Sequence, residues 1–394
     1  MSNRYDLKYW LSTQAVRDGA EAIFSECQNG QTHFVFHEEK MAPLAANVAE
    51  VCRANYPSLK IPYHSRWRHF DVLDEGRSKK FKEKLTHLSN EDRIRSEIDL
   101  LIVSVLLDAG AGAEWQYTDS ASGKKVGRSE GLALASIDAF EEGFFSSDKS
   151  RPFQVDGERL KSIELKDLEK VFQADENNRL AGLEGRLSLL RSLGEQILES
   201  KFFPQRRPGS LWDYWSSDFG DKLEATDLLL LLLESLGPIW PSRLNMDGVA
   251  LGDVWNYKDH KLAFHKLSQW LTYSLIDTLR ENGLNISNVN HLTGLAEYRN
   301  GGLFVDAGVL TLKNEEQLSQ SHEVSSELIL EWRALTIALL DKLLPYVQDE
   351  LSLPDLSLPA LLEGGTWATG RRLAREKRVD ASPPIKIVSD GTVF

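Results

Sequence analysis

Apolar residues recur at intervals of three and four along most of this 394-residue chain, and that spacing predicts a mainly α-helical fold. The clearest case is 323–348, where Val324, Leu328, Trp332 and Leu335 begin a stripe along one helix face. Pro345 is expected to kink or end this helix. The other predicted helices cover 8–26, 43–55, 79–88, 91–107, 129–142, 157–172, 177–200, 221–235 and 260–281.

Signals for strands are few. The alternation in 33–37 and the run 386–389 predict two short strands, and 245–253 predicts a turn or a small hairpin. Pro, Gly and Arg become frequent after about Leu353, which predicts an irregular tail. We therefore expect three segments: a helical N-terminal extension (1–90), a helical core (91–350) and a tail (351–394) that packs back on the core.

Charge and composition exclude several classes of protein. The formal charge of −13 argues against a protein that coats nucleic acid or an anionic membrane. The longest purely apolar run, Leu228–Leu233, is too short to span a bilayer, and the first residues lack an apolar signal core. Cys27 and Cys52 are the only cysteines and have no metal-binding or redox spacing. We expect a cytoplasmic protein without metal or organic cofactor, and leave a homo-oligomer open.

The segment 291–310 combines two carboxylates and a guanidinium with apolar and glycine-rich surroundings. Glu297, Arg299 and Asp306 are the charged residues in it. Charges enter such surroundings when they are paired or take part in chemistry, because an unpaired buried ion costs several kcal/mol, roughly. Two interpretations follow: a buried Glu–Arg pair that locks a loop, or a carboxylate held in a dry pocket as a general base or cation stabiliser.

A second glycine-rich segment follows the apolar run 100–107. Gly110 and Gly112 suggest a dinucleotide-binding fingerprint, but the third glycine is missing and a polar loop stands where a helix is required. The favoured interpretation is a helix that ends in a tight turn and presents Asp108, Trp115 and Tyr117. The two aromatic side chains then either stack on a ligand ring or fill the core.

Two further clusters are candidates for ligand binding. In 62–70, Arg66 and Arg68 flank a tryptophan with His64 nearby, which suits a phosphate and a sugar or equally a solvated basic loop. The predicted helix 260–281 places polar side chains at helical spacing on one face, which line a pocket or serve the core. They are His265, Gln269, Thr272 and Tyr273.

Four stretches together resemble one known family. They are Tyr63-His-Ser-Arg-Trp-Arg-His-Phe70, Leu107-Asp-Ala-Gly-Ala-Gly112, Leu292-Thr-Gly-Leu-Ala-Glu-Tyr-Arg-Asn-Gly-Gly-Leu-Phe-Val-Asp306 and Ser389-Asp-Gly-Thr-Val-Phe394. Over essentially the whole chain the sequence resembles the family called uracil catabolism protein four. That resemblance implies a place in a pyrimidine-degradation route in which uracil is ribosylated, its ring is opened and urea is released.

Residues 95–347 are also distantly similar to the queuosine 5′-phosphate N-glycosylases, helical relatives of DNA glycosylases. The similarity rests on Gly127–Gly143, on Leu292-Thr-Gly-Leu-Ala-Glu-Tyr-Arg299 and on Glu327-Leu-Ile-Leu-Glu-Trp-Arg333. It implies a helical, DNA-glycosylase-like body. This chain departs from the pattern in three places: Glu297 replaces an aspartate, Ser274 falls near a second aspartate, and Gly301-Gly302 replace Pro-Gln. A second carboxylate must then come from Asp277 or Asp306.

Both resemblances imply an N-ribosyl hydrolase that releases urea from a ribosylurea compound, with the 5′-phosphate as the expected form. Breaking an N-glycosidic bond leaves positive charge on the sugar, which carboxylates stabilise. Glu297 is assigned that role, Asp306 or Asp108 the second acid, Arg299 a positioning role, and Arg66 and Arg68 the phosphate. Two alternatives stay open: hydrolysis of a C–N bond in a ring-opened ureido compound, and a non-catalytic protein that binds a pathway partner.

Overall fold

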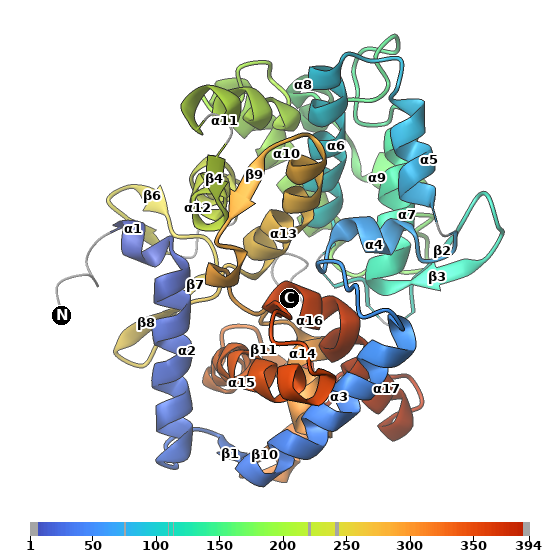
Figure 1. Ribbon diagram of the computed structural model, residues 1–394. Coiled ribbons are helices and arrows are strands. Elements are labelled where there is room, and N and C mark those ends of the chain that lie inside the picture. Colours follow the sequence, from blue (N-terminus) through green and yellow to red (C-terminus); the bar gives the residue numbers. More distant parts are fainter. Residues whose placement is uncertain are drawn as a thin grey trace. The chain divides into compact units, whose positions relative to one another are not determined.

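The computed structural model describes residues 7–74, 76–108, 110–112, 114–219, 222–240 and 244–388 (Figure 1). Helices account for most of these residues, so the predicted mainly α-helical class is confirmed. Contacts between Cα atoms divide the chain into two units, which are described separately. Among the described residues, the first unit comprises those within 7–64, 244–269 and 288–388, and the second comprises those within 65–240 and 270–287.

The first unit contains the ends of the chain's described part. Its helices are α1 (Leu7–Trp10), α2 (Thr13–Gln28), η2 (Glu38–Lys40), α3 (Met41–Asn55), η5 (Val289–His291), α14 (Tyr298–Asp306), η6 (Glu315–Ser319), α15 (Glu327–Leu351), α16 (Leu358–Leu361), the π-helical turn η7 (Leu362–Thr366) and α17 (Trp367–Lys377). Its strands are β1 (Phe34–Phe36), β5 (Asn245–Met246), β6 (Val249–Ala250), β7 (Val254–Tyr257), β8 (His260–Ala263), β10 (Leu310–Leu312), β11 (Ser321–Glu323) and β12 (Lys386–Val388).

The second unit is built mainly from the middle of the chain. Its helices are α4 (Arg66–Phe70), α5 (Arg77–Lys84), α6 (Asn90–Leu106), α7 (Arg128–Glu141), α8 (Gly157–Ser162), α9 (Leu165–Val171), α10 (Leu183–Glu199), η3 (Pro208–Ser210), α11 (Leu211–Phe219), α12 (Ala225–Leu236) and η4 (Gly237–Ile239). Its strands are β2 (Gln116–Thr118), β3 (Lys125–Gly127), β4 (Lys222–Glu224) and β9 (Asn285–Ser287). Helix α13 (Lys266–Glu281) has four residues in the first unit and the rest in the second.

Helix α15 is the centre of the first unit. Its predicted stripe is buried, and the helix packs against α2, α3 and α14. Pro345 lies inside this helix, which continues to Leu351, so the expectation that Pro345 ends it is wrong. The predicted tail is irregular at 352–357 and again after α17, but α16, η7 and α17 are helical, and α17 packs against α14 and α3.

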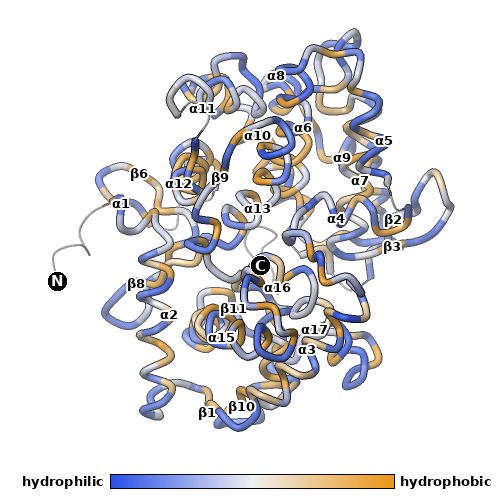
Figure 2. Tube along the Cα trace, in the orientation of Figure 1, coloured by the Kyte–Doolittle hydropathy of each residue, from blue (hydrophilic) through white to orange (hydrophobic). Residues whose placement is uncertain are grey.

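In the second unit, α6 is buried over its last three turns and packs against α7, α10 and α11. The leucine run of α12 stands out as strongly hydrophobic in Figure 2. Of the nine residues from Leu228 to Leu236, seven are buried, Leu230 is half-buried and Glu234 is exposed. Along the described stretches of the chain, no helix is both long and apolar enough to cross a membrane.

Four predicted helices have different ends because local hydrogen bonds interrupt the apolar pattern. The segment 8–26 breaks at Ser12, whose side chain caps α2 by accepting the N–H of Ala15. The segment 157–172 breaks at Ile163, and a reciprocal capping box between Glu164 and Asp167 begins α9. Helix α10 begins only at Leu183, and 260–263 form strand β8 rather than the first turn of α13.

The predicted strands are present in the first unit. Strand β1 pairs with β10 antiparallel, β12 pairs with β11 parallel, and β5 and β6 form the expected hairpin. The segments predicted as 1–90, 91–350 and 351–394 do not coincide with the two units, since each unit combines distant stretches; that division stays a prediction. Residues 389–394, which carry one motif of the resemblance, and residue 221 at the start of a predicted helix lie outside the described residues.

Gly301 allows α14 and α15 to approach closely. A Cβ atom at Gly301 would lie 2.8 Å from Cε2 of Trp332 and 2.9 Å from Oγ1 of Thr336. We expect Gly301→Ala to lower the free energy of unfolding by about 1–3 kcal/mol, because the added methyl overpacks this crossing. Gly302→Ala is the matched control, since its Cβ meets only ring atoms of Pro384, the nearest at 3.1 Å. Denaturant unfolding that found Gly301→Ala no less stable than Gly302→Ala would contradict this packing argument.

A buried ion pair joins α15 to the β7 region. Both terminal nitrogens of Arg333 donate to the carboxylate of Asp253, at 2.9 and 2.7 Å, and the guanidinium lies over the ring of Phe264. Burial by itself would raise the pKa of Asp253, but Arg333, the indole of Trp255 and the N–H of Lys266 outweigh it and hold that pKa below its ordinary value.

The stability that this pair contributes is therefore fully present above the pKa of an unfolded aspartate, about 3.9, and is lost as the pH falls through the lower folded value. We expect Asp253→Asn to cost about 3–5 kcal/mol near pH 7, because it leaves Arg333 buried without its counter-ion. The difference from the wild type should shrink as the pH falls below about 4 in denaturant unfolding. A difference that is constant with pH would contradict it.

Candidate functional site

Arg66 is the centre of a polar cluster inside the second unit. Ser65 caps α4 and so places Arg66 at the first position of that helix. The guanidinium is fully buried. Its Nε donates to Oγ of Ser104 at 2.7 Å, and its Nη1 donates to Oδ1 of Asp108 at 2.5 Å. The predicted candidates Arg66 and Asp108 are therefore brought together, and Arg66 does not lie in a solvated loop.

Asp108 also binds a hydroxyl group. Oγ of Ser129 donates to Oδ1 of Asp108 at 2.6 Å and lies 3.0 Å from Nδ1 of His69. Arg66 Nη1 reaches both the hydroxyl and the carbonyl oxygen of Ser129 at 3.1 Å. Within the described part of the chain, Oδ2 of Asp108 accepts no hydrogen bond; the side chain of Asp108 is 7% exposed and Ser129 is half-buried. The cluster thus presents one carboxylate oxygen beside a hydroxyl and an imidazole.

A buried arginine holds the turn that carries Asp108. Arg186, on α10, donates from Nε to the carbonyl of Leu107 at 2.8 Å and from Nη2 to the carbonyl of Gly110 at 3.1 Å. Burial lowers the pKa of this guanidinium to about 10, and the nearby Asp108 opposes the shift. Gly110 and Gly112 both have positive φ, of 24° and 81°. The predicted tight turn is confirmed, and a helix precedes it where a dinucleotide fingerprint requires a strand.

The aromatic residues after this turn are occupied in the core of the second unit. Nε1 of Trp115 donates to the carbonyl of Phe172 at 2.8 Å, and the ring is almost fully buried. The hydroxyl of Tyr117 donates to Oδ2 of Asp138 at 2.7 Å. Burial, together with Asp138, raises the pKa of Tyr117. The two alternatives for Trp115 and Tyr117 were stacking on a ligand ring and packing in the core, and these contacts support packing in the core.

Two other predicted residues lie in the same unit. Arg68 forms an ion pair with Asp277 of α13, at 3.0 Å, with the arginine one-third exposed. Burial raises the pKa of Asp277, and Arg68 opposes the shift. Tyr273 is fully buried on α13. Arg68 is thus already neutralised by a carboxylate rather than held ready for a phosphate.

In the first unit, Glu297 caps a helix. Its carboxylate accepts the N–H groups of Arg299 and Asn300, at 2.8 and 2.5 Å, at the N-terminus of α14. A negative side chain is favoured there by the helix dipole and the free N–H groups. Arg299 donates from Nη1 to the carbonyl of Ala381 at 3.0 Å and lies over the ring of Tyr298. Glu297 is 8% exposed, so it is neither on the open surface nor fully enclosed.

Asp306 lies at the opposite end of α14. Arg378 binds both of its carboxylate oxygens, at 2.8 and 2.5 Å, and Asp306 is almost fully buried. Glu297 and Asp306 are nine positions apart, which is about 14 Å along the helix axis. Asp306 therefore fastens the segment after α17 to α14 and does not join Glu297 in one cluster.

His64 contacts an acid that the sequence did not indicate. Its Nδ1 lies 2.8 Å from Oε2 of Glu363, whose other oxygen accepts from the hydroxyl of Tyr56 at 3.0 Å. Glu363 belongs to the π-helical turn η7, a rare geometry that recurs at functional sites. The sequence feature that could have indicated this turn is Gly364-Gly365. These glycines let the turn approach α3 closely, because a Cβ at Gly365 would lie 2.5 Å from a methyl of Val48.

His265 and Gln269 form buried hydrogen bonds that join segments of the first unit that are distant in sequence. His265 precedes α13 with a φ of 50°, so the prediction that it belongs to the helical face is wrong; it lies in the link between β8, which ends at Ala263, and α13, which begins at Lys266. Its Nε2 lies 2.7 Å from the carbonyl of Trp10, and burial lowers its pKa. Gln269 exchanges hydrogen bonds with Thr293, at 2.6 and 2.8 Å, and so holds the stretch that leads to Glu297.

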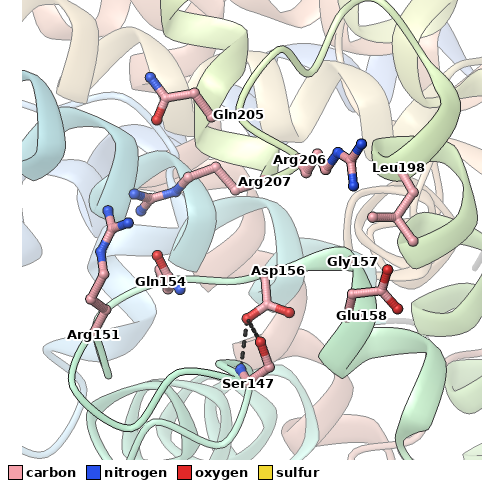
Figure 3. Close-up of a pocket in the computed structure, with 10 residues that line it drawn as sticks. All are labelled: Ser147, Arg151, Gln154, Asp156, Gly157, Glu158, Leu198, Gln205, Arg206 and Arg207. Atoms are coloured by element: carbon pink, nitrogen blue, oxygen red, sulfur yellow. Dashed lines mark hydrogen bonds between the residues drawn. The ribbon is translucent and has the colours of Figure 1, made fainter.

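One pocket of the second unit is lined in part by arginine side chains. This pocket of about 310 Å³ is lined by Arg151, Arg206 and Arg207, among others (Figure 3). Arg207 is bound to the buried Asp99, and in Figure 3 the guanidinium of Arg206 points away from the other two. Among the residues whose positions are described, no group of three or more His, Cys, Asp or Glu is arranged to hold a metal ion.

Comparison with known proteins places the chain in a family. Residues 9–394 match the family described as "Protein of unknown function (DUF1688)". The chain belongs to this family. It is 43% identical over 402 residues to "Protein urg3" of Schizosaccharomyces pombe, covering 98% of both chains. It is 38% identical over 434 residues to "Uracil catabolism protein 4" of Lachancea kluyveri, covering 98% of this chain and 99% of the relative.

These matches confirm the first resemblance, to the uracil catabolism protein four family. They span both units, so neither unit is an addition peculiar to this chain. The similarity to queuosine 5′-phosphate N-glycosylases has no counterpart among these matches and stays a prediction.

The role of Arg186 can be tested apart from any activity. We expect Arg186→Met to speed amide hydrogen exchange at Leu107 and Gly110, because their carbonyl groups lose the donor that fixes the turn. Arg191→Met is the matched control, because Arg191 lies on the same helix but donates to the carbonyl of Ile163. Equal exchange at the turn in both variants would show that other contacts hold Asp108.

Proposed function

We propose that this protein acts in uracil catabolism as an N-ribosyl hydrolase, releasing urea from a ribosylated urea compound, with the 5′-phosphate as the expected form. The printed name of the Lachancea kluyveri relative supports the pathway, since the two chains align over nearly their whole lengths. The distant similarity to N-glycosylases motivates the reaction. The cluster around Asp108 is the observation that carries the assignment of catalytic groups.

That cluster has the properties which cleavage of an N-glycosidic bond requires. Breaking the C1′–N bond leaves positive charge on C1′ and the ring oxygen of the sugar, while the departing nitrogen takes the electron pair and a proton. Water then adds to C1′ and loses a proton. Oδ2 of Asp108 stabilises the cation or takes that proton, and Ser129 connects Asp108 to His69 through two short hydrogen bonds.

A second property of the cluster supports a ligand there. Nη2 of Arg66 is buried and has no hydrogen-bond partner within the stretches that the structure describes. A buried donor left unpaired costs about 1–3 kcal/mol and is rare in folded proteins, so this one is a candidate for a hydrogen bond to a bound ligand. A hydroxyl or carbonyl oxygen of the substrate would supply it. Arg66 is accordingly assigned to a substrate oxygen or to holding Asp108, and no longer to the phosphate.

The other two predicted acids have different assignments. Asp306 is fully engaged by Arg378, so we assign it a structural role. Glu297, in the first unit, stays the alternative carboxylate for the reaction, beside its role as the cap of α14. The two roles are separable, because glutamine at this position keeps one oxygen, which still accepts one of the two backbone N–H groups.

The proposal is tested by incubating the purified protein with ribosylurea, with and without the 5′-phosphate, and assaying urea and free ribose or ribose phosphate. We expect both products in equal amounts. Asp108→Asn should lower kcat by about 10²–10⁴, and the assay is run well below the unfolding temperature of the variant because the substitution also removes the counter-ion of the buried Arg66. Asp349→Asn, an exposed substitution on α15, is the matched control and should not change kcat. Urea formed without free ribose would overturn the proposed bond and favour C–N cleavage in a ureido compound.

Glu297→Gln separates capping from chemistry. We expect a free energy of unfolding lower by about 1 kcal/mol, since the amide oxygen still caps one of the two N–H groups, and a large loss of kcat where Glu297 rather than Asp108 is the reacting carboxylate. Circular dichroism and the urea assay measure the two effects. Wild-type turnover by this variant would remove Glu297 from the reaction and leave Asp108 as the only proposed acid.

A further inference from the structure

A pocket of the second unit is separate from the Asp108 cluster. It has a volume of about 710 Å³ and lies between α5, the turn that joins β2 to β3, and the C-terminal end of α7. Phe70, Leu73 and Leu134 form an apolar part of its lining. That volume is in the range of small-molecule sites, which combine apolar walls with a few polar groups.

Three carboxylates of this pocket converge on one guanidinium. Nη2 of Arg77 binds Asp138 and lies 3.4 Å from Oε2 of Glu141, while its Nη1 lies 3.5 Å from Oδ1 of Asp119. Glu141 also pairs with Lys84 at 2.8 Å. The whole lining contains five acidic residues and three basic ones, so its formal charge is −2. The basic residues of the wall therefore leave the acids only partly neutralised.

Two carboxylate oxygens in this pocket accept no hydrogen bond. Oδ1 of Asp119 and Oε1 of Glu141 are both buried and both lack a hydrogen-bond partner in the described part of the chain. The side chain of Asp119 is 4% exposed, and its other oxygen already accepts the N–H of Ser122 at 2.7 Å. Buried carboxylate oxygens without donors are costly, and each is a place for an N–H group of a ligand.

Three of the acids also lie at the C-terminal end of α7, where the helix dipole disfavours negative charge. Asp138 and Glu141 occupy the last turn of α7, Glu142 caps it, and no basic residue lies in that turn. The C-terminal end of a helix carries partial negative charge, so carboxylates there are destabilising. Because Arg77 and Lys84 offset only part of this cost, a bound cation would relieve the remainder.

We propose that this pocket binds a small organic dication, two N–H-bearing cationic groups joined by an aliphatic spacer. One cationic group would donate to Asp119 and the other to Glu141, while the spacer lies against the apolar wall. A doubly charged ligand balances the formal charge of the lining. This inference does not depend on the proposed hydrolase, since the pocket shares no residue with the Asp108 cluster.

The experiment is isothermal titration calorimetry of the full chain with agmatine, which carries a guanidinium and an ammonium group on a butyl spacer. We expect binding that weakens with added salt and is at least about tenfold tighter than that of the monocation n-pentylamine. Asp119→Asn and Glu141→Gln should each weaken agmatine binding by about tenfold or more, because each removes a charge-assisted acceptor. Asp349→Asn should bind like the wild type.

Two substitutions are used because Asp119 also orders the β2–β3 turn, so a loss of binding in Glu141→Gln is informative if Asp119→Asn fails to fold. Thermal unfolding of each variant checks folding. The proposal is overturned if agmatine shows no binding at 10 mM, roughly the weak limit for a small specific ligand, or if folded variants bind it as well as the wild type. Tighter binding of Mg²⁺ or Ca²⁺ than of agmatine would also overturn it, in favour of a metal site. Urea release is not a readout here, so failure of this proposal leaves the hydrolase untouched.

Discussion

Buried arginines organise both units of this protein. Arg66, Arg186 and Arg333 are essentially without solvent exposure, and removing an unpaired guanidinium from water costs several kcal/mol, roughly. Each of these guanidinium groups therefore restricts how the segments that carry its hydrogen-bond acceptors can be arranged. Arg333 requires Asp253, while Arg66 and Arg186 together require the turn at Asp108. The position of the candidate carboxylate follows from satisfying these cations rather than from the apolar core alone.

The fold was predictable from sequence where a decision is local. An apolar stripe at helical spacing must face a core, and α3, α6, α7 and α15 occur where that spacing placed them. Helix ends were less predictable because they depend on single hydrogen bonds, such as the cap that Ser12 provides for α2. The start of α13 was missed for a different reason. His260–Ala263 contains too few residues for a period of two to be distinguished from the first turn of a helix, and only pairing with β7 decides it.

Individual residues of the candidate site could be predicted from the sequence, but not which of them lie together in the structure. Arg66 and Asp108 each stand out, as a cation among aromatics and as an acid before glycines. Their pairing depends on α4 and α6, which bring together residues 42 positions apart. Ser129 gave no signal because serine near the start of a helix is usually read as a cap. The predicted pair of Glu297 and Asp306 was separated because α14 is a continuous helix between them, and the partner of Asp306 lies 72 residues away.

Helix α7 connects the two proposed sites of the second unit. Ser129 stands in its first turn beside Asp108, and Asp138 and Glu141 stand in its last turn at the acidic pocket. Ser129 and Asp138 are nine residues apart, which is about 14 Å along the helix. At that distance one unit charge changes the energy of another by at most about 1 kcal/mol at an effective dielectric constant near 20. A cation in the pocket would therefore influence Asp108 only weakly through its field. Strong coupling would require movement of α7 itself, and its buried face against α6 opposes such movement.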